Sequence, residues 1–115
     1  MQKPDAHRRS QHRIEAAIPL HVRGVDVYGI EFEDSAKALE VSRRGLSFLT
    51  QRELAVSATL TLLIPGLGPT RPGEGPGDFF TEAAVVRILP EGEHLFRVSV
   101  RFMGATLPMY SAENI

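Results

Sequence analysis

Phe96-Arg97-Val98-Ser99-Val100-Arg101-Phe102 is the stretch of this sequence that decides the fold. Apolar and polar residues alternate along it without a break. A period of two places one face of a β-strand against a core and the other face in water. Residues 18–23 and 58–62 show the same alternation, so they are also predicted to be strands.

Three shorter apolar segments are predicted as additional strands: 27–32, 46–49 and 85–89. In the last of them Val86 and Ile88 are expected to share one face. Residues 91–93, which follow a proline, are predicted as the turn of a hairpin. Residues 35–39 fit either one helical turn or an extended strand. Six short strands at this spacing predict an all-β fold, either a sandwich or a barrel. We expect a small six-stranded antiparallel barrel, because closure also protects the sheet edges.

The length and composition predict a single small domain. The chain has 115 residues, 43% of them hydrophobic, which is ordinary for a globular domain. It has no cysteine, so disulfides, thiolate catalysis and thiolate metal sites are excluded. No apolar run approaches the ~18 residues of a membrane helix, and the N-terminus does not resemble a signal peptide. We therefore expect a cytoplasmic protein that does not insert into a membrane.

The charge is unevenly distributed. Residues 1–13 hold four basic residues and one acidic residue, a net of +3, which leaves nine basic and thirteen acidic residues, a net of −4, in 14–115. We expect a flexible basic arm over 1–13, a barrel over 14–104 and a tail over 105–115. The arm either meets an anionic partner or is an ordinary solvated terminus. Residues 65–78 contain four Pro and five Gly and are predicted to form a flexible connecting loop.

The familiar signatures of catalysis and metal binding are missing. None of the four histidines has a metal-ligand spacing to another ligand residue: His7, His12, His21 and His94. There is no Gly-x-Ser-x-Gly nucleophile elbow, and neither of the common glycine-rich phosphate-binding loops occurs. We therefore expect a protein that is not an enzyme and that has no metal site and no cofactor.

Two polar clusters remain, Arg8-Arg9-Ser10-Gln11-His12-Arg13 and Glu40-Val41-Ser42-Arg43-Arg44-Gly45. Arginine offers a flat fork of donors that grips a phosphate or a guanine edge at two points, and its plane stacks on bases. A glycine that closes a turn permits positive φ or close approach of another backbone. Together these groups suit a guest that combines phosphate with a purine. Taken singly, each cluster is more typical of a solvated surface and an ordinary turn.

In order and spacing, these clusters resemble the motifs of the PilZ family of cyclic di-GMP receptors. Arg9 and Arg13 match Arg-x-x-x-Arg before the first strand, and Ser42 and Gly45 match Asp/Asn-x-Ser-x-x-Gly. Glu40 departs from the pattern, because it stands where the family has Asp or Asn. The resemblance spans residues 8–103, and it implies a PilZ-type barrel that binds cyclic di-GMP through a set of residues from both clusters: Arg8, Arg9, Arg13, Glu40, Ser42, Arg44 and Gly45.

The resemblance also implies a mechanism. The arm folds over the nucleotide, and the changed surface signals to an effector protein that the sequence does not identify. Two alternatives stay open. One is a degenerate PilZ interaction module that no longer binds the nucleotide, for which Glu40 is the best argument. The other is a small barrel that binds a nucleic-acid polymer. An aromatic content of 7% and the acidic body argue against this last alternative.

Overall fold

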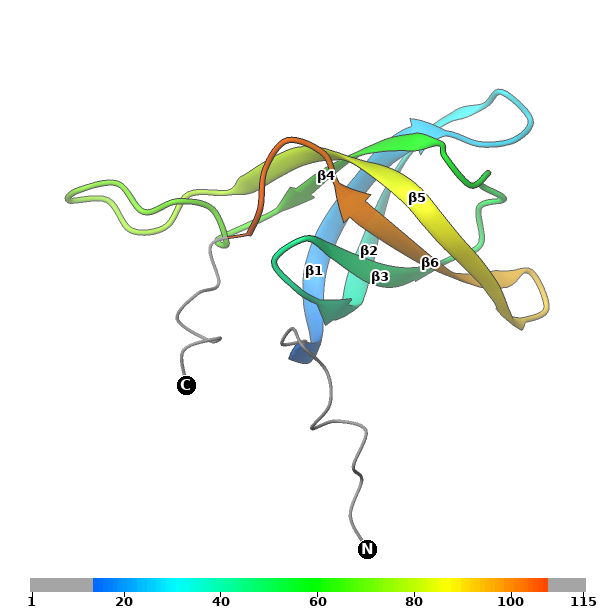
Figure 1. The fold of residues 1–115 in the computed structure, drawn as a ribbon, viewed down its shortest axis with the longest axis horizontal. Coiled ribbons are helices and arrows are strands. Elements are labelled where there is room, and N and C mark those ends of the chain that lie inside the picture. The colour runs from blue at the N-terminus through cyan, green and yellow to red at the C-terminus, as the bar shows by residue number, and fades with distance from the viewer. Residues whose placement is uncertain (1–13, 108–115) are drawn as a thin grey trace, which may run out of the picture.

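The computed structural model describes residues 14–107, which form a closed barrel of six antiparallel strands (Figure 1). The strands are β1 (Ile14–Val25), β2 (Glu31–Val41), β3 (Gly45–Thr50), β4 (Thr59–Ile64), β5 (Phe79–Gly92) and β6 (Leu95–Phe102). Around the barrel they follow the order β1-β2-β3-β6-β5-β4, and β4 closes on β1. The predicted all-β, six-stranded barrel is confirmed. Among residues 14–107 there is no helix long and apolar enough to cross a membrane.

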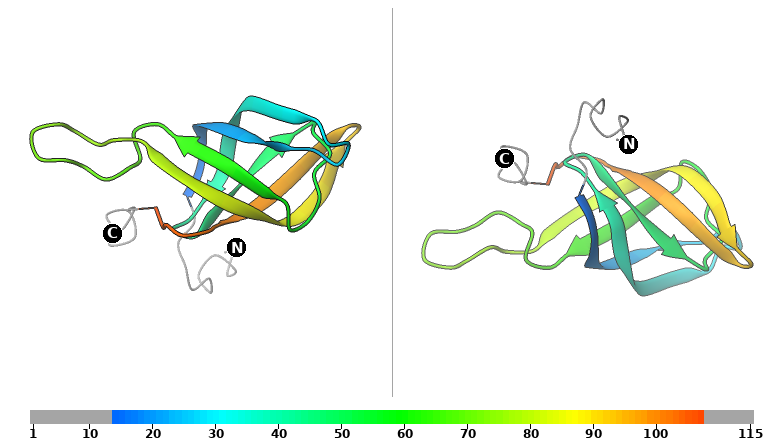
Figure 2. Two further views of the ribbon diagram at one scale, coloured as in Figure 1. Left: turned by 90° about the horizontal axis from the view of Figure 1, so that it is seen from above. Right: turned by 90° about the horizontal axis from the view of Figure 1, so that it is seen from below.

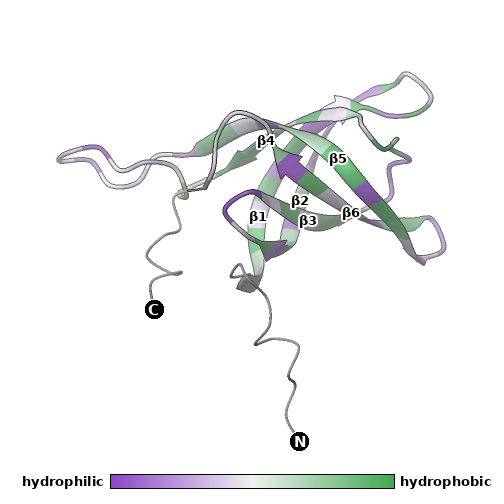
Figure 3. Cartoon of the chain, viewed as in Figure 1, coloured by the Kyte–Doolittle hydropathy of each residue, from purple (hydrophilic) through white to green (hydrophobic). Residues whose placement is uncertain are grey.

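The core follows from the alternation along the strands. On β6, Val98 and Val100 are buried, while Arg101 between Val100 and Phe102 points outward and is exposed. Figure 3 shows this change between polar and apolar residues along β6. Phe48 on β3 is 1% exposed and lies opposite Val98. Complete burial of side chains of this size stabilises a fold by about 1.5–3 kcal/mol each, so the interior holds the barrel together.

The turn between β1 and β2 overturns one predicted strand. Residues 27–32 were expected to be extended, but β2 begins only at Glu31. The carboxylate of Asp26 accepts hydrogen bonds from the backbone N–H groups of Tyr28 at 2.9 Å and Ile30 at 3.0 Å. Gly29 has φ of 80°, which suits glycine and bends the chain back. The strand prediction is therefore wrong for residues 27–30, and of the two alternatives for 35–39 the extended strand is confirmed.

A β-bulge in β5 overturns a second expectation. The register of β5 against β6 shifts between Val85 and Arg87, so one extra residue lies on β5. Val85 is buried, Ile88 packs against the core, and Val86 between them is 50% exposed. Val86 and Ile88 therefore do not share a face. The hairpin turn was predicted over 91–93. It lies at residues 93 and 94, because Gly92 still belongs to β5 and pairs with Leu95.

Residues 65–78 form an extension that projects from the barrel (Figure 2). They connect β4 to β5 without a regular strand, as the sequence predicts. Their backbone is nevertheless hydrogen-bonded across the extension, from Gly68 N to Gly77 O at 2.8 Å and from Gly77 N to Pro69 O at 3.0 Å. At its base, the N–H of Gly66 donates to the carboxylate of Asp78 at 3.1 Å. These contacts give the extension a defined path despite its proline and glycine content.

The seam between β1 and β4 is short. It consists of three residue pairs and ends at Arg23 opposite Thr61. β1 continues through Gly24 to Val25 without pairing to β4. A Cβ at Gly24 would lie 2.5 Å from the side chain of Leu60, so glycine leaves room for that buried leucine. Because no residue of β1 beyond Arg23 pairs with β4, the two strands diverge there.

Candidate functional site

The turn between β2 and β3 contains the second polar cluster of the sequence. The backbone N–H of Ser42 donates to the carbonyl of Gly45 at 2.9 Å, and its hydroxyl donates to the same carbonyl at 3.2 Å. The Ser42 hydroxyl oxygen also accepts the N–H of Arg44 at 3.4 Å. Serine commonly closes turns by local hydrogen bonds of this kind. Ser42 therefore has a structural role in the turn, independent of any ligand.

Gly45 is explained by close packing. Its φ is not positive, so the turn does not require glycine for its backbone conformation. A Cβ at this position would overlap the carbonyl oxygen of Val100 on the neighbouring strand β6. Of the two reasons that the sequence offered for this glycine, close approach of a backbone is the correct one. The backbone that approaches is that of the barrel itself.

The turn is also anchored by the end of β6 and the segment that follows it. The N–H of Phe102, at the end of β6, donates to the carbonyl of Arg44 at 2.7 Å. The N–H of Leu107 donates to the carbonyl of Arg43 at 2.9 Å, and the Leu107 side chain is buried. The segment that follows β6 thus packs along the turn. The turn has a fixed position relative to β6, which a preorganised binding site requires.

Four of the predicted site residues lie around one surface pocket of about 200 Å³: Glu40, Ser42, Arg44 and Gly45. The remaining three, Arg8, Arg9 and Arg13, fall outside the described residues. Ile14, the first residue of β1, pairs with Val41, the neighbour of Ser42. The chain therefore enters the barrel beside the pocket.

The other wall of the pocket comes from residues that the sequence did not single out: Ser47, Val86, Ser99 and Arg101. They reach the turn through strand register, since Gly45 lies opposite Arg101 and Ser47 lies opposite Ser99. Local patterns along the chain do not encode such long-range pairing. Val86 is turned toward the pocket by the bulge in β5. In the sequence, only the alternation along residues 96–102 pointed to Ser99 and Arg101, because it predicts that their side chains face outward.

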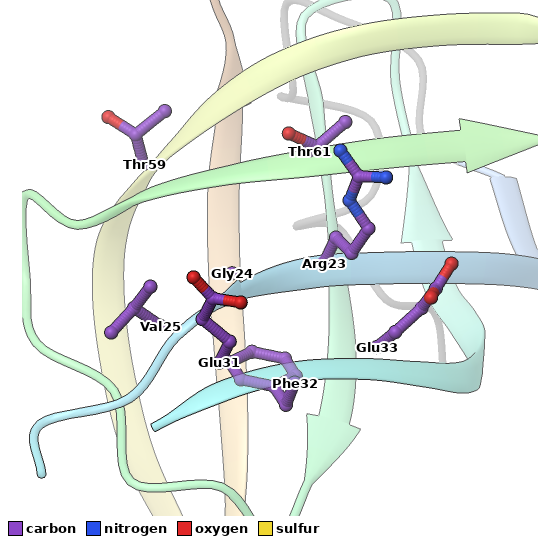
Figure 4. A pocket seen from close by; sticks show the side chains of 8 residues that line it. All are labelled: Arg23, Gly24, Val25, Glu31, Phe32, Glu33, Thr59 and Thr61. Atoms are coloured by element: carbon purple, nitrogen blue, oxygen red, sulfur yellow. The ribbon is translucent and has the colours of Figure 1, made fainter. Parts of the chain in front are cut away.

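A larger hollow, about 560 Å³, lies where β1 and β4 diverge and contains none of the predicted residues. Figure 4 shows Arg23 and Thr61 on one side of it, with Glu31 and Glu33 on β2. Two carboxylates accompany the single guanidinium, so a ligand with two phosphate charges would meet repulsion there. The smaller pocket beside the turn is the better candidate for an anionic ligand.

Metal chemistry has no support from the described residues. Within 14–107 there is no group of three or more His, Asp or Glu side chains that could hold a metal ion. His21 and His94 are both exposed, on β1 and in the β5–β6 turn. His7 and His12 lie outside the described residues.

No family model matches the sequence, and no curated protein matches it. Several solved structures do. The inhibitor of motility MotI/DgrA from Bacillus subtilis is 19% identical with a TM-score of 0.59, and the match covers 85% of this chain and 43% of that one. The MrkH–c-di-GMP complex from K. pneumonia is 16% identical with a TM-score of 0.57, over 84% of this chain and 44% of that one. This chain therefore spans less than half the length of either protein.

The PilZ domain of YcgR from Escherichia coli, solved with c-di-GMP, is similar over nearly its whole length. It is 18% identical with a TM-score of 0.53, and the match covers 92% of this chain and 85% of that one. Identities this low establish a shared fold. The closed six-stranded antiparallel barrel and these similarities show that the chain has the fold of a PilZ domain.

Proposed function

We propose that this chain is a cytoplasmic cyclic di-GMP receptor domain that has no catalytic activity and signals to a partner protein. The observation that carries the proposal is the gathering of Glu40, Ser42, Arg44 and Gly45 around one pocket at the β2–β3 turn. These residues were selected from motif spacing alone. Their position on a barrel similar to a PilZ domain solved with c-di-GMP supports the same use here.

The size of the pocket supports a role for the arm. Sites that enclose a drug-sized ligand usually measure about 300–1,000 Å³. A pocket of about 200 Å³ can hold one part of a cyclic dinucleotide but not all of it. The rest of the ligand then needs a second surface. Because Ile14 pairs with Val41, the arm that precedes Ile14 starts at the edge of the pocket and can supply that surface.

In this proposal Arg9 and Arg13 grip the phosphates and guanine edges with charge-assisted hydrogen bonds. Arg8 supplies an additional cation, which fits a stacked pair of ligands. Arg44 adds positive charge from the turn. Ordering of the arm offsets part of the binding energy and changes the surface that an effector meets. The ligand is the small dinucleotide, not a nucleic-acid polymer.

The degenerate interaction module is the second candidate, and two observations favour it. Ser42 and Gly45 both have structural roles within the barrel, so the motif can persist without a ligand. Glu40 carries one methylene more than the family's Asp. A longer side chain displaces its carboxylate, and one hydrogen bond lost in this way reduces binding by about 0.5–3 kcal/mol.

Titration calorimetry with cyclic di-GMP, GMP and single-stranded DNA separates the candidates. The receptor proposal predicts heat with cyclic di-GMP alone, and no heat with any of the three supports the degenerate module. Arg9→Ala and Arg13→Ala should each weaken binding by about ten- to a hundredfold. Lys3→Ala is the matched control, because it removes the same charge from the arm outside the motif. Equal losses of affinity for Lys3→Ala and Arg9→Ala would mean that the arm acts only through its overall positive charge.

A further inference from the structure

The turn between β1 and β2 exposes a group of apolar side chains, at the other end of β2 from the nucleotide pocket. Within the part of the chain that the structure describes, nine large apolar side chains are clearly exposed. Four of them lie in the short stretch 25–30, and each is between 47% and 67% exposed: Val25, Val27, Tyr28 and Ile30. Turns are usually built from glycine and small polar residues. A cluster of exposed apolar side chains in one turn, here named the apolar tip, is typical of a surface that meets a partner.

The apolar tip has a fixed backbone. The N–H of Val27 donates to the carbonyl of Glu53 at 2.9 Å, and the Tyr28 hydroxyl donates to the carboxylate of the same glutamate at 2.7 Å. The carboxylate of Asp26 accepts two N–H groups from within the turn. These hydrogen bonds hold the turn in one place while its apolar side chains stay in water. A preformed surface of this kind loses little conformational entropy when a partner docks.

The apolar tip adjoins an acidic hollow. Val25 pairs with Glu31 and lines the large hollow together with Glu31 and Glu33, so the two surfaces are continuous (Figure 4). Among the described residues neither glutamate forms an ion pair. Arg23 is the one guanidinium in the lining of the hollow, and the two carboxylates that hold the turn add to the negative charge nearby. The combined surface therefore attracts cationic side chains and repels anionic groups.

This charge distinguishes between possible occupants. A second copy of the chain that docked through the same surface would bring identical carboxylates face to face. Anionic lipid headgroups would be repelled in the same way. A protein segment that combines aliphatic side chains with lysine or arginine fits both parts of the surface. The hollow, of about 560 Å³, has room for long cationic side chains.

We propose that the apolar tip and the adjoining hollow form a docking surface for a partner protein whose contact segment carries aliphatic residues next to lysine or arginine. The aliphatic side chains cover Val27 and Ile30, and the cationic groups enter the hollow and meet Glu31 and Glu33. The inference does not rest on nucleotide binding, because Glu31 and Glu40 place the two surfaces at opposite ends of β2. The partner can therefore dock while the pocket is occupied.

Fluorescence anisotropy of the full chain with a short dye-labelled peptide, in which a block of valines precedes a block of lysines, tests this inference. Two further peptides are the controls, one with glutamate in place of lysine and one with serine in place of valine. The valine–lysine peptide should bind about tenfold more tightly than either control, and its affinity should fall as salt is added. Equal affinity for the valine–lysine and serine–lysine peptides would show that charge alone is recognised, and it would overturn the inference.

Paired variants locate the binding surface. Ile30→Ser and Glu31→Gln should each weaken binding of the valine–lysine peptide several-fold, because one removes apolar contact and the other removes charge. Leu89→Ser and Glu93→Gln are the matched controls, an exposed leucine and an exposed glutamate on the β5–β6 hairpin, and both should keep the original affinity. Losses of the same size in all four variants would overturn the inference, as would unchanged affinity in Ile30→Ser and Glu31→Gln.

Two further measurements need no folded variant to be interpreted. Addition of the peptide should move the amide chemical shifts of residues 24–33, and shifts confined to another part of the barrel would contradict the proposed surface. Sedimentation of the unmodified chain should show no self-association through the apolar tip, and a dimer that Ile30→Ser disrupts would make a second copy the occupant and overturn the inference. None of these outcomes depends on cyclic di-GMP, so the docking surface and the receptor proposal can fail separately.

Discussion

Arg52, in the segment after β3, donates two hydrogen bonds to the carboxylate of Asp34 on β2, from Nε at 2.8 Å and from Nη2 at 2.9 Å. The same guanidinium lies 4.8 Å from the centre of the Phe32 ring. Asp34→Asn should therefore lower the melting temperature by a few degrees at pH 7, since it removes the charge of a two-point contact that water partly screens. Glu91→Gln, at the single contact with Arg97 of 3.2 Å, is the control and should have less effect.

The same pair predicts a dependence on pH. The hydrogen bonds from Arg52 hold the pKa of Asp34 below its ordinary value. The folded protein thus binds this proton more weakly than the unfolded chain, so the contribution of Asp34 is complete above the unfolded pKa of about 3.9 and is lost as the pH falls through the lower folded pKa. Denaturant titrations of the protein and of Asp34→Asn should converge in that acidic range. A gap that stays constant down to pH 2 would contradict the assignment.

Gly45→Ala should destabilise the barrel, because its Cβ would overlap the Val100 carbonyl and force β3 away from β6. Overpacking of this kind costs about 1–3 kcal/mol, which urea unfolding can measure. Gly92→Ala is the control, since a Cβ there would meet only the Cβ of Leu95 at an ordinary 3.9 Å. Equal losses in the two variants would mean that the close approach at Gly45 has no special cost.

Tyr28 should ionise later than an ordinary tyrosine. Its hydroxyl donates to the carboxylate of Glu53 at 2.7 Å, and this hydrogen bond raises the pKa of Tyr28. The effect stabilises the fold below the ordinary pKa of about 10 and is lost as the pH rises through the folded value. In a Tyr110→Phe background, where Tyr28 is the sole tyrosine, ultraviolet absorbance should report the shift directly. Glu53→Gln should return the titration toward the ordinary range.

Glu40 should limit the affinity for the nucleotide. It lies opposite Ser47 on β3 and lines the pocket, so its carboxylate places a negative charge there. Glu40→Asn should tighten cyclic di-GMP binding by at most about 1 kcal/mol, by relieving repulsion with the phosphates. That gain should shrink as salt is added. Glu40→Asp keeps the charge and separates side-chain length from repulsion, and weaker binding in both variants would show that the glutamate is a favourable contact.

Local pattern was enough to predict most of the strands, because they alternate in the sequence as they do in the structure, but it left a sandwich or a barrel open. The pattern failed where an extra residue in a strand changes which of the following side chains point inward. The bulge at Val85 and Val86 moves the next inward position to Ile88, and alternation alone cannot locate such an insertion. It failed again at Gly29, whose positive φ turns an apolar-looking segment into a bend.

The candidate site was predictable on one side only. Ser42 and Gly45 were found because the turn motif is continuous in the chain. Arg101 and Ser47 were not, because their place at the pocket depends on the register of β3 against β6, about fifty residues apart in sequence. The burial of the Ser47 hydroxyl is likewise a product of packing, which an alternating pattern does not report.

The anchoring of the β2–β3 turn has a consequence for the sign of charge that it can receive. The carbonyl oxygens of three successive residues, Arg43, Arg44 and Gly45, already accept hydrogen bonds from other groups of the protein. Carbonyl oxygens are the backbone groups that attract cations, and here they are already occupied by hydrogen-bond donors. The charged side chains of these residues are both guanidinium groups. The partial negative charges of these carbonyl groups are thus satisfied by hydrogen bonds, while the arginine side chains of the turn carry positive charge. The turn therefore favours an anion over a cation.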